Sequence, residues 1–437
     1  MAKYHTQFGS AACGLVLAAV TGCVDSPTLG DVESRSSVEF ELNPDEQAPA
    51  GNRFGVAATY SSAGAIDFGN AFFRTDLGTN GRSCASCHDP RAGWTVSSDL
   101  AEQLFDESNG LDPLFRLHDA GTRPDAPIAT SSERKQSFKP VTKYARIRFG
   151  QSIPAAGQYE VIAIDDPTGF GTTAAHTRFR RPNPTSNAKF VSSLTWTAGG
   201  LPVPLFQQIL FPIAVNFHAQ GPSPSAEINA EGAEFAMSVF HAQVIDNKAG
   251  RLDAEGAKGG PVALASFEFT PGMNSGENFN PKVFDLFDAW ENSDNPHRRK
   301  IWRGQEVFNT KTFGNGATCG GCHNTPNVGS SSSFVLRRVG TDVPGPGTDD
   351  LPKLTIRNKT TGEVKVVTDV GAGLNGNWND IGRFKVQHLR GLASRAPFFH
   401  DGRAKNLHEV IDHYDAFFNI GFTDDEKADL AAFLYAL

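Results

Sequence analysis

The strongest hydrophobic pattern lies close to the C-terminus. Leu407, Val410, Ile411, Tyr414 and Phe418 recur at intervals of three and four residues. This is the spacing of side chains on one face of an α-helix. We therefore predict an amphipathic helix that turns these residues, Tyr414 included, toward a core.

Two further patterns predict a terminal helix and a hairpin. Thr423 and Glu426 have the spacing of a capping box, and the residues from Leu430 to Leu437 carry an apolar helical stripe. Leu354–Ile356 and Val364–Val366 are short β-favouring runs on either side of a glycine-containing turn. They predict a small β-hairpin.

Another pattern occurs twice in the chain, with identical spacing in two segments. The pairs are Ile66 and Ile301, Gly69 and Gly304, Phe73 and Phe308, Thr75 and Thr310, Gly81 and Gly316, and Cys84 and Cys319. The first three positions of each segment lie on one face of a helix, so we expect a helix before each cysteine. The repetition indicates an internal duplication.

Each repeat ends in a C-x-x-C-H motif. The motifs are Cys84, Cys87 and His88, and Cys319, Cys322 and His323. Two thiols so spaced can bond the vinyl groups of one haem, and the histidine can ligate the iron. A zinc site or a redox dithiol fits less well, because zinc-binding pairs usually lie closer together and a dithiol needs no histidine. The sequence thus predicts two covalently bound haems c.

Composition agrees with a folded protein of more than one domain. The chain has 437 residues, 39% of them hydrophobic, and includes 33 Phe, which is enough for a large core. We predict a mainly α fold with two cytochrome c-like domains, a small β-hairpin and long loops. The net charge of -8 gives no electrostatic footprint for nucleic acid.

The N-terminus has the pattern of an export signal. Lys3 precedes the apolar segment Ala11–Val20, which is too short to span a bilayer, and Cys23 ends a sequence similar to a bacterial lipobox. We expect residues 1–22 to be a lipoprotein signal peptide and Cys23 to carry the lipid; ordinary cleavage near the same place is the alternative. The protein would then be exported and membrane-tethered on the periplasmic side.

The rest of the chain divides into three predicted segments. Residues 23–50 are polar and acidic and are expected to form a flexible tether. Residues 51–295 would form the N-terminal haem domain, with insertions. Residues 296–437 would form the C-terminal haem domain.

The second iron ligand is informative because methionine is scarce. The three methionines are Met1, Met237 and Met273, so none follows the second motif. Tyr414 is then the best-placed ligand for the second haem, and a core tyrosine is the alternative. A weaker repeat makes Pro212 its equivalent in the first half. Proline cannot ligate iron, so one haem would be closed and the other open to peroxide.

These motifs resemble the bacterial di-haem cytochrome c peroxidase/MauG family. The similarity runs from about Gly64 to Leu437 and is most specific in Gly69–Phe73, Lys385–Arg390 and Ala396–Gly402. It implies that hydrogen peroxide reacts at the N-terminal haem and that electrons pass through the C-terminal haem. A tyrosine at the position of Tyr414 is similar to the MauG branch, whereas the peroxidase branch usually has methionine at that position. The implied partners are a protein electron donor or a protein substrate.

The resemblance also implies roles near the first haem. Trp196, Gln208 and Pro212 match a tryptophan between the haems, a distal glutamine and a distal proline. His218 stands where the family has a glutamate. It could act as an acid/base group, as an iron ligand or as a loop residue. We expect His118 to be a loop residue, and iron ligation is the alternative.

One implication of the resemblance, a metal ion between the domains, stays open. The family often holds calcium between its domains, and here Arg395 replaces a threonine near that site. Its permanent charge could take the place of the ion or point away.

The alternative function is a non-catalytic periplasmic electron-transfer cytochrome with both irons closed. A haem-based sensor is a third.

Overall fold

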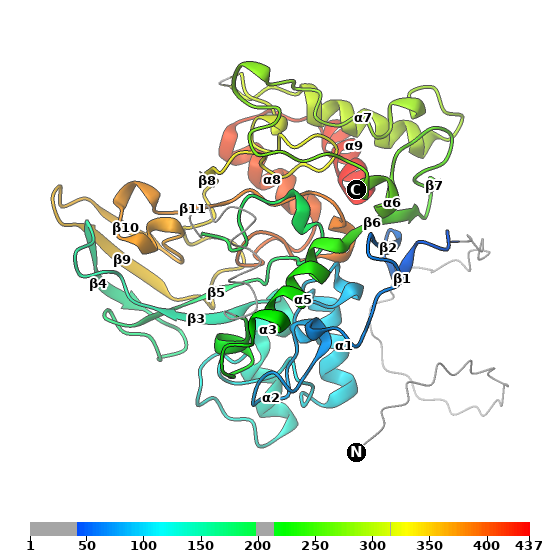
Figure 1. Ribbon diagram of the computed structural model, residues 1–437. Helices are drawn as coiled ribbons and strands as arrows, with labels where there is room; N and C mark the ends of the chain where they lie inside the picture. Colours follow the sequence, from blue (N-terminus) through cyan, green and yellow to red (C-terminus); the bar gives the residue numbers. More distant parts are fainter. Residues whose placement is uncertain (1–41, 198–213, 315) are drawn as a thin grey trace, which may run out of the picture. The chain divides into compact units, whose positions relative to one another are not determined.

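The apolar stripes near the C-terminus form two packed helices. A computed structural model describes residues 42–197, 214–314 and 316–437. The two predicted helices are α8 (Leu407–Phe418) and α9 (Asp424–Tyr435), and the predicted capping box begins α9. Helix α9 packs on both α8 and α7 (Pro296–Thr310), so the three helices lie together (Figure 1).

The contact between α7 and α9 is close enough to require glycine. A Cβ atom added to Gly304 would lie 2.0 Å from the carbonyl oxygen of Asp429. Ile301 and Phe308 of α7 and Phe433 of α9 are buried around this point. The predicted helical face of the second repeat is therefore confirmed.

The helix predicted in the first repeat is wrong. Around the equivalent positions only Ala71–Phe73 is helical, as one 3-10 turn. The Asp67 side chain accepts a hydrogen bond from the Gly69 amide at 2.8 Å, and the Asn70 side chain accepts one from Phe72 at 2.9 Å. Such local bonds compete with helix formation.

The missing helix moves the aromatic contact by one residue. Phe308 packs against His323 with ring centroids 6.3 Å apart. In the first half Phe72, and not the repeat-equivalent Phe73, packs against His88 at 6.4 Å. The two halves thus place an aromatic ring beside the motif histidine from different backbone conformations.

The described residues contain more β-structure than the single predicted hairpin. Four antiparallel sheets have the strand orders β1-β2-β6-β7, β10-β9-β4, β11-β8 and β3-β5. The strands are β1 (Gln47–Asn52), β2 (Gly55–Ser61), β3 (Ile147–Gln151), β4 (Tyr159–Asp165), β5 (His176–Arg180), β6 (Val239–Asp246), β7 (Gly250–Arg251), β8 (Leu336–Arg338), β9 (Lys353–Asn358), β10 (Val364–Val367) and β11 (Arg383–Lys385). The predicted hairpin is confirmed as β9 and β10, and β4 extends it from a distant segment.

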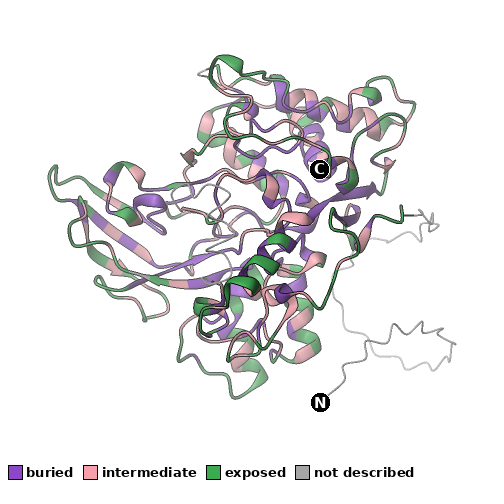
Figure 2. Ribbon diagram, viewed as in Figure 1, coloured by how far each residue is buried: buried purple, intermediate pink, exposed green. Residues whose placement is uncertain are grey.

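The remaining helices cover the sheets and the first motif. Among the described residues they are α1 (Ser98–Ser108), α2 (Ser131–Ser137), α3 (Lys139–Tyr144), α5 (Ala226–Ser238) and α6 (Gly260–Ala265). Helices α1, α2 and α3 lie together, and α6 packs on β6 and β2 (Figure 1). Strand β6 is buried along its whole length (Figure 2).

Two predicted segment boundaries meet the structure differently. Strand β1 pairs with β2 and begins at Gln47, so the last residues assigned to the tether belong to the fold. The core formed by α7, α8 and α9 also includes buried residues between Ala249 and Trp290, which the sequence assigned to the first domain. The division at Pro296 stays a prediction. No helix in the described ranges is both long and apolar enough to cross a membrane.

We expect Gly304→Ala to destabilise the protein by about 1–3 kcal/mol, because the added methyl group overlaps the main chain of α9. Urea denaturation of the haem-loaded protein measures this loss. Gly51→Ala is the matched control, since its Cβ would meet nothing within 4 Å. Equal midpoints for the two variants would contradict the close packing of α7 on α9.

Candidate functional site

The first C-x-x-C-H motif forms one tight turn. Cys84–Ser86 is a 3-10 turn, and the His88 amide donates to the Cys84 carbonyl at 3.0 Å. Nδ1 of His88 donates to the carbonyl oxygen of Trp94 at 3.1 Å. This bond leaves the lone pair of the neutral ring on Nε2. Burial lowers the pKa of His88 to about 4, so the ring is neutral at pH 7.

The second motif repeats this arrangement. Cys319–Gly321 is a 3-10 turn, and the His323 amide donates to the Cys319 carbonyl at 3.0 Å. Nδ1 of His323 donates to the carbonyl oxygen of Gly329 at 2.6 Å. The acceptor again lies six residues after the histidine. Burial lowers the pKa of His323, so both rings offer Nε2 as a neutral ligand atom.

Each motif lines its own cavity. Cys84, Cys87 and His88 line the first cavity, and the corresponding three residues line the second. All four thiols are free and half-buried. A pair of free thiols on a turn, beside a neutral imidazole and an apolar cavity, fits the covalent attachment of haem c. The residues present therefore suit this group in both halves.

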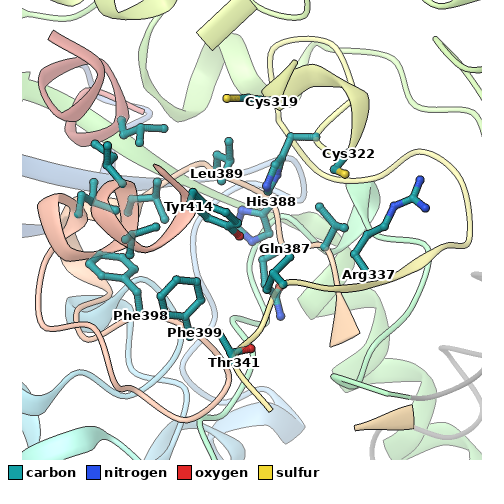
Figure 3. Close-up of a pocket in the computed structure, with 18 of the residues that line it drawn as sticks. Cys319, Cys322, Arg337, Thr341, Gln387, His388, Leu389, Phe398, Phe399 and Tyr414 are labelled. Carbon is teal, nitrogen blue, oxygen red and sulfur yellow. The ribbon is translucent and has the colours of Figure 1, made fainter. Parts of the chain in front are cut away.

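Tyr414 enters the second cavity from α8. Figure 3 shows it among the residues that line this cavity, together with His388 and Cys322. Burial raises the pKa of Tyr414, and the nearby Cys322 and Cys319 add to the effect. The Tyr414 side chain therefore lies on the wall of the cavity that His323 also lines.

The two cavities share one wall. Trp196 lines both, together with Pro182 and Pro184 and the two cations Arg181 and Lys385. The indole Nε1 of Trp196 donates to the Arg181 carbonyl at 2.8 Å, and the Trp196 carbonyl accepts from the Lys385 amide at 2.8 Å. These two bonds fix the tryptophan in the partition.

His218 lines the first cavity and is held by a buried carboxylate. It ends the π-helical turn Ala214–His218, and its Nδ1 lies 2.9 Å from Asp119 Oδ2. Arg82 Nη1 donates to both oxygens of Asp119, at 2.8 and 2.7 Å. Burial opposes ionisation of Asp119, but the bonds from His118, His218 and Arg82 hold its pKa well below the usual range. The carboxylate is thus ionised and orients the imidazole.

Sequence reasoning missed Asp119 and Arg82. Both are almost fully buried, with 4% and 2% of their surfaces exposed, yet neither belongs to a periodic pattern or a motif. His118, expected to be a loop residue, has Nε2 3.3 Å from the same Asp119 oxygen. The adjacent His118 and Asp119 are the one sequence signal that could have pointed to this site.

Three predicted residues lie outside the described residues. They are Gln208, Pro212 and Cys23. Their predicted roles stay predictions.

Arg395 points inward at the position where calcium is implied. Its Nη2 donates to the His388 carbonyl at 3.0 Å, and its own carbonyl accepts from Arg181 at 2.7 Å. Burial lowers the pKa of Arg395 to about 9, with Arg181 adding to the effect. Within the described ranges no group of three His, Cys, Asp or Glu side chains could hold a metal ion. Calcium ligation by carbonyl groups stays a prediction.

The chain is similar to cytochrome c peroxidases. Over 181 residues it is 29% identical to the cytochrome c551 peroxidase of Nitrosomonas europaea, a match that covers 40% of this chain and 43% of that protein. Over 171 residues it is 30% identical to the cytochrome-c peroxidase IdrP1 of a Pseudomonas species, covering 35% of this chain and 43% of that protein. The chain therefore matches less than half the length of these relatives. These relatives confirm the predicted resemblance to the cytochrome c peroxidases.

Among solved structures, the chain is similar to a MauG-like protein associated with microbial copper homeostasis. The TM-score is 0.41 at 17% identity, with 92% of this chain and 95% of that chain covered. No protein-family model matches the chain.

Proposed function

We propose that this relative of the cytochrome c peroxidases is a di-haem c-type oxidoreductase that reduces hydrogen peroxide at the haem of Cys84 and Cys87. Electrons would arrive through the haem of Cys319 and Cys322. The observation that carries the proposal is the pair of matching cavities, each with one motif, separated by a wall that contains Trp196.

The motif histidines would hold the irons through Nε2, because Nδ1 of each ring is committed to a carbonyl. Haem c, when bound, supplies the redox-active iron at which peroxide is reduced. Tyr414 would be the second ligand at the His323 haem. The positive charge of a ferric iron would offset the burial that raises the pKa of this tyrosine.

His218 would move the proton on the peroxide side. With Nδ1 bonded to Asp119, its Nε2 can accept a proton from hydrogen peroxide and return it to the departing oxygen as water. Asp119 would keep the ring in this tautomer, and Arg82 would keep Asp119 ionised. His218 would thus take the place of the family's glutamate as the acid/base group, with a side chain of different length.

Residues 1–41 lie outside the described residues, and their role is part of the proposal. We propose that residues 1–22 direct export and that Cys23 is lipidated, which would place the enzyme at the periplasmic side of a membrane. Its partner would be a protein, acting either as electron donor or as substrate.

We expect His218→Ala to slow the reaction of the ferric protein with hydrogen peroxide by roughly 10²- to 10⁴-fold, because the variant lacks a general acid/base. Stopped-flow absorbance after mixing with peroxide measures the rate. His408→Ala is the control, since His408 is an exposed residue of α8. An unchanged rate in His218→Ala would remove this residue from the mechanism.

In the His218→Ala protein, Asp119→Asn should slow the reaction no further if Asp119 acts through that ring.

The same traces separate the competing functions. Reaction of half-reduced protein alone would indicate a peroxidase that needs reductive activation. Inertness in both oxidation states would favour the electron-transfer cytochrome.

We expect Tyr414→Phe to change the ferric absorption and electron paramagnetic resonance spectra of one haem, and to raise the reduction potential of that haem. An anionic phenolate stabilises ferric iron, and phenylalanine cannot replace it. Tyr60→Phe, at a partly buried tyrosine that lines neither haem cavity, is the control. Spectra identical to those of the unmodified protein would exclude Tyr414 as a ligand.

A further inference from the structure

Two buried cations lie in the wall between the cavities. Arg181 and Lys385 are only 7% and 8% exposed, and each lines both cavities. Both are tied to Trp196 through main-chain hydrogen bonds, one from its indole and one to its carbonyl. Their charges are therefore placed at the boundary that both haems would face.

The protein satisfies these cations with neutral groups. Arg181 Nη2 donates to main-chain carbonyls at 2.9 and 2.7 Å, and its Nε is buried without a hydrogen bond. Lys385 Nζ donates to the Ser193 and Leu194 carbonyls at 2.9 and 3.4 Å. Within the described ranges neither side chain forms an ion pair with a carboxylate.

Two other buried arginines have the carboxylate partner that, among the described residues, Arg181 and Lys385 lack. Arg180 adjoins Arg181 in the chain, and Asp369 binds it through two bonds of 2.6 and 2.7 Å. Arg82 has Asp119 in the same way. Burial without such a partner lowers the pKa of Arg181 to about 9 and that of Lys385 to about 7. A buried charge is costly unless an anion compensates for it.

We propose that Arg181 and Lys385 form one anion site that binds propionate carboxylates of both haems, so that this pair of cations sets the reduction potentials of both irons. The inference rests on the proposed binding of two haems, but it does not rest on peroxide reduction. Haem carries two carboxylates at one edge. The shared wall is the place where carboxylates from two haems can meet the same positive charges.

The expected consequence is a shift shared by the two haems. A positive charge near an iron favours the reduced state, so its removal lowers the reduction potential. A cation that faced only one cavity would shift one haem. Arg337 offers this comparison, because it lines the second cavity alone and is exposed.

The test is a potentiometric titration of the haem-loaded protein, in which absorbance or electron paramagnetic resonance distinguishes the two haems. We expect Lys385→Gln to lower both potentials, and Lys385→Arg, which keeps the charge, to retain both near their original values. Arg337→Gln should shift the second haem at most. A shift of one haem alone in Lys385→Gln, or of neither, would overturn the inference.

A second variant and the absence of peroxide keep the outcomes distinct. If Lys385→Gln takes up haem poorly, Lys385→Met preserves the apolar stem and serves in the same titration. The titration contains no peroxide. Shared shifts in a protein that is inert toward peroxide would therefore support the anion site while contradicting the proposed function. Fewer than two haems per chain would overturn both.

Discussion

The same kind of hydrogen bond orients the motif histidine in each half of the molecule. It runs from ring Nδ1 to a main-chain carbonyl six residues later, at Trp94 for His88 and at Gly329 for His323. The bond determines which nitrogen keeps a lone pair, and burial keeps the ring uncharged. That nitrogen is the proposed iron ligand, so the chemical role of the other residues that line the cavity depends on where it lies. The same bond appears although a helix precedes one motif and an irregular segment the other.

Local patterns predicted the elements that depend on local contacts. The stripe from Leu407 to Phe418 became α8 with the same bounds, and the capping box at Thr423 began α9. The same reasoning failed at residues 66–73, where the apolar spacing was helical. Side chains of Asp67 and Asn70 bond the main chain there and replace the helix by turns. Periodicity records which residues could share a face, but it ignores this competition.

Contacts between distant segments left no trace in the sequence. Strand β4 pairs with β9, and Tyr159 faces Asn358 in that register. Asp119 meets His218 across 99 residues and Arg82 across 37. Neither pairing follows a repeat or a spacing rule. The motif residues could therefore be predicted singly, whereas the buried groups that orient and charge their surroundings required the fold.

The buried pair of Arg82 and Asp119 has a consequence for how this protein can diverge. Each side chain is almost inaccessible to water, with exposures of 2% and 5%. Loss of one partner leaves the other as an isolated buried charge. A protein in that state is far less stable than one that has lost both partners. Substitutions at the two positions should consequently appear together in descendants of this chain. Because Arg82 stands two residues before the first thiol, the neighbourhood of the haem-attachment turn and the environment of His218 are constrained to evolve as one unit.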